Sequence, residues 1–217
     1  MPTTTGSLAS NLGGARVDRV RGEDIRDAAA SAVAFLQRHV DDDWSVPVPG
    51  LDFTVASVVA HAGEGPLWYA IDLTGGPQDE GAFEVKIRPD APPVNLTKSL
   101  SQAAELCATV VNAHPANARG FHPMGMADPS GFAAMACDEI LVHTYDAATG
   151  LEADFLPPVA LAARVLARLF PWHEPGDDPW VTLLWANGRL DLPGAPRPRR
   201  WRWHCAPLAE WDGAAPA

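Results

Sequence analysis

One stretch, Met135-Ala-Cys-Asp-Glu-Ile-Leu-Val-His-Thr-Tyr-Asp146, predicts a helix with three ionisable groups on a single stripe. At about 3.6 residues per turn, Glu139 and His143 stack on one face and Asp146 follows one turn later. Apolar residues such as Val142 flank the same stripe, so we expect it to face a core rather than solvent. The rest of the predicted fold is arranged around this helix.

A buried carboxylate and imidazole need a partner, and a divalent metal ion is one that satisfies both. The alternative is a surface pair or a satisfied core pair, which is common for Glu and His four residues apart. His61, in another amphipathic segment, favours the metal, because His61, Glu139 and His143 offer three ligands suited to zinc and leave a fourth position open. Asp146 fits the role of orienting a ligand imidazole. Glu64 is a candidate fourth ligand, with a solvated helix charge as its alternative.

Helical periodicity predicts an all-α core, a four-helix bundle within residues 21–156, preceded by a mobile tail at residues 1–20. The predicted helices span about residues 22–40, 55–73, 97–113 and 131–149. Within the second helix, Gly63-Glu-Gly-Pro66 predicts a kink or a restart just after His61, since proline removes a backbone donor. Residues 77–96 predict a surface excursion with a short strand at 83–87.

Residues 157–217 predict a small α/β appendage, a helix at about 157–170 followed by a Trp-rich subdomain. Asp178-Pro179 predicts the start of a short helix that ends before Gly188. The alternative is a strand with a hairpin turn at Asn187-Gly188. Residues 200–205 alternate between apolar and polar side chains, which predicts a strand that could pair with residues 189–192.

Composition excludes several function classes. A formal charge of −11 and a pI near 4.9 argue against nucleic-acid and anionic-membrane partners. Three widely spaced cysteines without a C-x-x-C pair favour a reducing cytosol and disfavour a disulfide scaffold. With no apolar run of about 18–20 residues and no signal-like N-terminus, we expect a cytoplasmic protein. The oligomeric state is left open, a homodimer included.

Four segments carry a resemblance to a known family: Trp44 to Gly50, Phe53-Thr-Val, His61, and Asp138-Glu-Ile-Leu-Val-His-Thr-Tyr-Asp-Ala147. In this order the chain resembles the DinB-like superfamily, and within it the mycothiol-dependent maleylpyruvate isomerase group, over roughly residues 20–150. The resemblance implies zinc held by His61, Glu139 and His143, with mycothiol as the working thiol. Maleylpyruvate itself is not implied as the substrate, because the family covers many different members.

The same family suggests a thiol- or substrate-binding arginine, for which Arg189 and Arg202 are candidates, with a surface role as the alternative for each. Among the other histidines, His122 precedes the fourth helix in a loop of the kind that lines site mouths.

Three functions are consistent with these patterns. The first is a zinc-dependent enzyme that uses a low-molecular-weight thiol to isomerise or S-conjugate a small electrophilic substrate. The second is a zinc-dependent hydrolase, with Asp146 or Glu64 as base. The third is a non-catalytic, metal-stabilised protein that binds a partner through its Trp-rich tail.

Overall fold

A computed structural model describes residues 19–78, 81–174 and 176–215. Most of the tail expected at residues 1–20 therefore lies outside the described residues. Val20, at the end of that range, is buried in the core.

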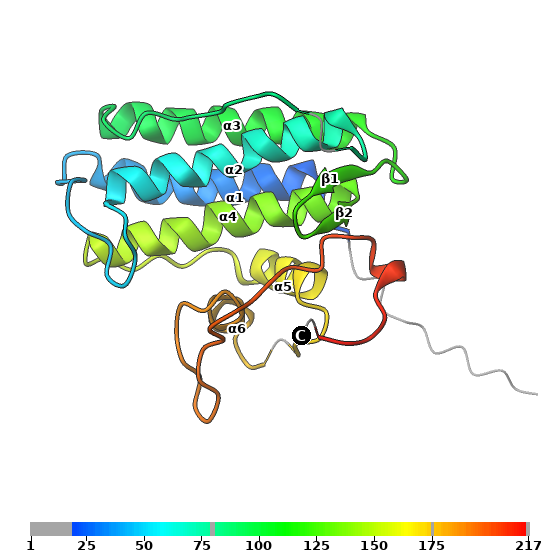
Figure 1. Ribbon diagram of the computed structural model, residues 1–217. Coiled ribbons are helices and arrows are strands. Elements are labelled where there is room, and N and C mark those ends of the chain that lie inside the picture. The colour runs from blue at the N-terminus through cyan, green and yellow to red at the C-terminus, as the bar shows by residue number, and fades with distance from the viewer. Residues whose placement is uncertain (1–18, 79–80, 175, 216–217) are drawn as a thin grey trace, which may run out of the picture.

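Four long helices lie side by side and form the bundle (Figure 1). They are α1 (Gly22–Leu36), α2 (Val55–Gly75), α3 (Pro93–Ala113) and α4 (Pro129–Gly150), with a short 3₁₀ turn, η1 (Gln37–His39), after α1. Both α1 and α2 pack against α3 and α4. The predicted all-α four-helix core is confirmed. None of the helices in the described ranges has the length and apolarity needed to cross a membrane.

Local sequence sets the helix starts. Thr54 accepts the backbone N–H of Ser57 at the start of α2. Asp128 accepts the N–H of Gly131 at the start of α4. Helices α3 and α4 each begin on a proline, whose fixed φ suits the first helical position. These caps fix where the two helices that carry the predicted ligands begin.

Helix α4 is buried along most of its length, because α1, α2 and α3 cover one side of it and α5 (Val159–Leu169) packs on another. Its apolar residues are not confined to one stripe: Phe132, Cys137 and Leu141 are all fully buried. A helix that is apolar on every side belongs in an interior. Any charged group on this helix must therefore find a partner inside the protein.

The second helix does not break and restart after His61. Helix α2 runs from Val55 to Gly75 with Pro66 inside it. Gly63 and Gly65 serve packing rather than a break: a Cβ on Gly63 would lie 2.6 Å from Cδ1 of Ile87, and one on Gly65 would lie 3.1 Å from Cγ of Glu139. Packing against α3 and α4 thus outweighs the local tendency of proline to end the helix.

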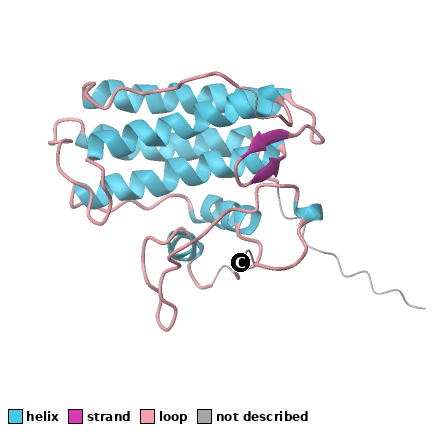
Figure 2. Cartoon of the chain, in the orientation of Figure 1, coloured by secondary structure: helices cyan, strands magenta, loops and turns pink. Residues whose placement is uncertain are grey.

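The strand expected at residues 83–87 does not form. Residues 81–91, here called the strap, run as irregular chain along the bundle from the end of α2 towards the start of α3 (Figure 1). A short antiparallel hairpin forms elsewhere, where only a loop was expected, from β1 (Gly120–His122) and β2 (Gly125–Ala127) (Figure 2). It precedes α4 and packs near α2.

The appendage contains α5, α6 (Pro179–Ala186) and a 3₁₀ turn, η2 (Leu208–Glu210). The predicted short helix is confirmed: Asp178 caps it, and Gly188 follows with a φ of 71°. The alternative hairpin is therefore wrong.

Residues 200–205 keep the predicted alternation but form no strand. Trp203 and Cys205 are buried, whereas Arg200 and Arg202 are exposed. In the described part of the appendage, the β pairing is an isolated bridge between Leu192 and Ala195, not a ladder between residues 189–192 and 200–205. Instead of a neighbouring strand, Asp138 of α4 accepts the indole N–H of Trp203, and Arg168 of α5 donates to the carbonyls of residues 204 and 205.

Candidate metal centre

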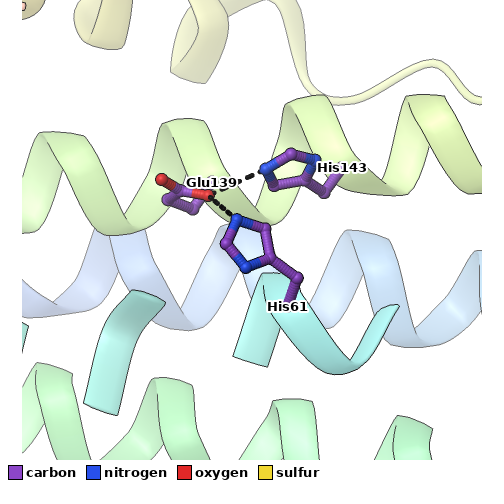
Figure 3. A group of neighbouring side chains, drawn as sticks. All are labelled: His61, Glu139 and His143. Carbon is purple, nitrogen blue, oxygen red and sulfur yellow. Dashed lines mark ion pairs between the residues drawn. The ribbon is translucent and has the colours of Figure 1, made fainter. Parts of the chain in front are cut away.

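The structure brings His61, Glu139 and His143 together between α2 and α4 (Figure 3). One ligand atom from each lies within 4.8 Å of the other two. Nε2 of His143 lies 2.9 Å from Oε2 of Glu139, and Nε2 of His61 lies 3.9 Å from the same oxygen. The three donors converge on one small space from two different helices.

Local geometry explains the convergence. Glu139 and His143 are four residues apart on α4, so their side chains stack on one face. Because Gly65 has no side chain, α2 approaches α4 closely enough for Glu139 to lie against it. The ring of Phe53 lies 5.7 Å from that of His61, between centroids, and forms an apolar edge beside the cluster.

Glu139 has one satisfied oxygen and one that lacks a hydrogen bond. The hydroxyl of Tyr69 donates to Oε1 at 3.0 Å. Oε2 is buried without a hydrogen-bond partner among the described residues, and Nε2 of His143 approaches it to 2.9 Å as an ion pair. Burial would raise the pKa of Glu139, but His143, His61 and Tyr69 together hold that pKa below its usual value. The group is thus a buried carboxylate whose free oxygen faces two imidazoles.

This donor set fits a divalent metal ion. Zinc bonds to N and O ligands of about 2.0–2.2 Å require ligand atoms roughly 3.3–3.6 Å apart in a tetrahedron. The observed separations of 2.9 and 3.9 Å lie on either side of that range. Two imidazoles and one carboxylate are a ligand combination of catalytic zinc sites, in which a fourth position remains open.

Asp146, the residue predicted to orient a ligand imidazole, contacts the ring of His143. Nδ1 of His143 lies 2.9 Å from Oδ2 of Asp146, so Nδ1 carries the proton and Nε2 is directed towards Glu139. Burial opposes protonation of His143, yet its contacts with Asp146 and Glu139 raise its pKa to about 9. Metal binding at Nε2 therefore releases a proton.

His61 is the exposed member of the cluster. Its side chain is 43% exposed, compared with 13% for Glu139 and His143, so the centre opens to solvent beside α2. Burial and the nearby His143 lower the pKa of His61, against the effect of Glu139 and Glu64. A neutral imidazole is the form that binds metal ions.

The two candidate arginines differ in where they lie. Arg189 is largely buried, and its guanidinium donates to both oxygens of Asp146 at 2.9–3.3 Å. Arg202 is exposed and donates to the backbone carbonyl of Met124. The structure thus connects Arg189, but not Arg202, to the contacts that reach His143.

The sequence analysis did not identify Tyr69, and it placed His122 in a loop of the kind that lines the mouth of a site. Tyr69 lies eight residues, about two helical turns, after His61, a spacing that places both on one face of α2. The ring of His122 packs 5.7 Å from the ring of Tyr69, between centroids, and its Nδ1 accepts the N–H of Met124. Burial lowers the pKa of His122.

The helical bundle and its His-Glu-His cluster define a DinB-like protein. The family model of the mycothiol maleylpyruvate isomerase N-terminal domain matches residues 25–148, more than half of the 217 residues, and the chain belongs to this family. The match covers His61, Glu139, His143 and Asp146, and ends before α5. Comparisons with curated proteins and with solved structures give no match.

Proposed function

We propose that the protein is a zinc-dependent enzyme that uses a low-molecular-weight thiol, mycothiol, to isomerise or S-conjugate a small electrophilic substrate. The observation that carries this proposal is the cluster of His61, Glu139 and His143, which offers three ligands and an open side within a domain of the mycothiol maleylpyruvate isomerase family. When bound, zinc would act as a Lewis acid and lower the pKa of a thiol at the open position.

The residues of the chain have separate tasks in this proposal. Glu139 offers its unbonded Oε2 to the ion, while Tyr69 fixes the other oxygen. Asp146 fixes the ring and tautomer of His143, and Arg189 holds Asp146 in turn. Fixed ligands keep the position for the thiol in one place, which is the positioning that a bimolecular reaction needs.

The nucleophilic sulfur must come from outside the chain. All three cysteines are buried and unpaired. Burial raises the pKa of Cys107 to about 12, and it also raises the pKa of Cys137 and of Cys205. Buried thiols with raised pKa values are poor sources of a thiolate at neutral pH, which supports the proposal of an exogenous thiol. Unpaired cysteines also support a cytoplasmic location.

A turnover assay tests the proposal. Purified protein is loaded with zinc and mixed with mycothiol and a small electrophile, with maleylpyruvate and 1-chloro-2,4-dinitrobenzene as probes for isomerisation and conjugation. We expect turnover that needs both zinc and mycothiol and that is lost in His143→Ala. Turnover of ester or amide probes at full rate without added thiol would overturn the proposal and favour hydrolysis. Absence of any thiol-dependent reaction, with zinc bound by four protein ligands, would favour a binding protein.

A further inference from the structure

Glu64 lies on the side of His61 that faces away from the cluster. Its Oε2 lies 3.9 Å from Nδ1 of His61, and its side chain is as little exposed as those of Glu139 and His143. Nε2 of the same imidazole faces Glu139. A metal ion bound at Nε2 would therefore have the His61 ring between itself and Glu64, which makes Glu64 unsuited to be a fourth ligand.

The strap holds the carboxylate of Glu64 in place. The backbone N–H of Ile87 donates to Oε1 at 2.9 Å, and the side chain of Ile87 fills the space that Gly63 leaves open. Nζ of Lys86 lies 3.8 Å from Oε2, the oxygen that faces His61. One oxygen is thus fixed by backbone, and the other lies between a flexible, exposed lysine and the imidazole.

The corresponding contact of His143 has hydrogen-bonding distance. Asp146 lies 2.9 Å from Nδ1 of His143 and is itself fixed by Arg189. Both histidines therefore have the same arrangement: Nε2 towards the cluster, Nδ1 towards a carboxylate three residues later on the same helix, and a donor that fixes the carboxylate. The contact at Glu64 is longer by 1.0 Å, within reach of a side-chain adjustment.

We infer that Glu64 is a positioning residue of the metal centre, which holds the imidazole of His61 through Nδ1 and is itself held by the strap. The inference rests on the metal-binding part of the proposed function. A hydrogen bond from Nδ1–H to Oε2 fixes the tautomer that leaves the Nε2 lone pair for the ion. Carboxylates of this kind contribute about 10–100-fold to metal affinity.

Zinc affinity of Glu64→Gln tests the inference, measured by competition with a chromophoric chelator. The amide oxygen can still accept the N–H of Ile87, so the strap keeps its anchor, but the amide NH₂ then faces the Nδ1–H of His61, donor against donor. We expect zinc to bind about 10–100-fold more weakly. The visible spectrum of the Co²⁺-substituted protein should keep its intensity, because no ligand is lost. Circular dichroism of the metal-free variant should match the wild type.

Lys86→Met is the matched control, because it removes the other charge near Oε2 and leaves the carboxylate. Its zinc affinity should equal that of the wild type. Unchanged zinc affinity in Glu64→Gln would overturn the inference. So would an equal loss in Lys86→Met, which would assign the effect to docking of the strap, or a changed Co²⁺ spectrum, which would make Glu64 a ligand. If the wild type itself binds no zinc, the proposed function fails as a whole.

Discussion

Within the bundle, α1 to α4 meet through apolar side chains such as Ile25, Leu100 and Leu141. The appendage, residues 159–215, adds its own apolar contacts but also binds the bundle through buried polar groups. Three acidic residues, the N-cap of α4 and two residues within α4, each accept hydrogen bonds from the appendage. The pairs are Asp128 with Arg168, Asp138 with Asn187 and Trp203, and Asp146 with Arg189.

This difference matters because the two kinds of contact respond differently to change. Apolar contacts are non-directional, and a core tolerates many substitutions of similar volume. A buried charge that loses its partner is costly, since it cannot recover its hydration. Burial and the nearby Glu139 already raise the pKa of Asp138 to about 7, even with hydrogen bonds from Asn187 and Trp203. Placement of the appendage therefore depends on a few specific pairs.

The largest expected effect lies inside the bundle. His143→Ala removes one of the three proposed ligands and should abolish stoichiometric zinc binding at micromolar protein. The helices should remain folded, because the apolar contacts of α4 are unchanged. Metal analysis after gel filtration, with circular dichroism as the control for folding, checks both expectations. Full zinc retention in the variant would remove His143 from the site.

The next effect should fall on the junction of bundle and appendage. The guanidinium of Arg168 is buried, and it donates to Asp128 and to the carbonyls of His204, Cys205 and Ala206. Arg168→Met leaves these acceptors without their donor. We expect the free energy of unfolding in urea to fall by about 3–5 kcal/mol.

A pair on the surface of the bundle supplies the control. Arg26 binds Glu105 with good geometry, but both side chains are largely exposed. Arg26→Met should therefore leave the free energy of unfolding in urea close to that of the wild type. Similar losses in both variants would show that the buried pair contributes no more than an exposed one.

A smaller effect should connect the appendage to the metal centre. Arg189→Met removes the donor that fixes Asp146 and should weaken zinc binding about 10-fold, at the lower end for an indirect contact. Arg202→Met removes an arginine that donates only to a backbone carbonyl, and its zinc affinity should equal that of the wild type. Chelator competition on both variants distinguishes them. Equal zinc affinities of the wild type, Arg189→Met and Arg202→Met would show that the appendage does not affect metal binding.

The smallest effect concerns thiol reactivity. In the wild-type protein, none of the three cysteines should react with a disulfide reagent at pH 8, because all are buried and their pKa values are raised. In Arg168→Met, Cys205 alone should become reactive, since its carbonyl loses the contact that holds residues 204–206 against α5. Reaction of Cys107 or Cys137 in that variant would show that the bundle opens together with the appendage.

Sequence predicted the bundle well because its information is periodic. The stripe of Glu139, His143 and Asp146 follows from the helical repeat, and a second histidine on an amphipathic helix was enough to place His61 beside it. The helical repeat does not determine how the helices pack against one another. The sequence did not predict that α2 continues through Pro66. Gly63 packs against the strap and Gly65 against Glu139, and these contacts can be seen only in the three-dimensional structure.

The appendage was harder to predict for a physical reason. Alternation at residues 200–205 indicated correctly which side chains are buried, but it did not show that Trp203 meets Asp138 of α4 rather than a neighbouring strand. Arg189 and Arg202 were equal candidates in the sequence, because no feature of the sequence distinguished them. A directional partner forty or more residues away leaves no periodic trace in the sequence.

The contact between Arg189 and Asp146 crosses the end of the family match, since residue 189 lies beyond residue 148. A change at residue 189 would thus alter how firmly Asp146 holds His143, while the three proposed ligands stayed the same. Changes in the least regular part of the molecule would therefore alter the strength of metal binding at the proposed site.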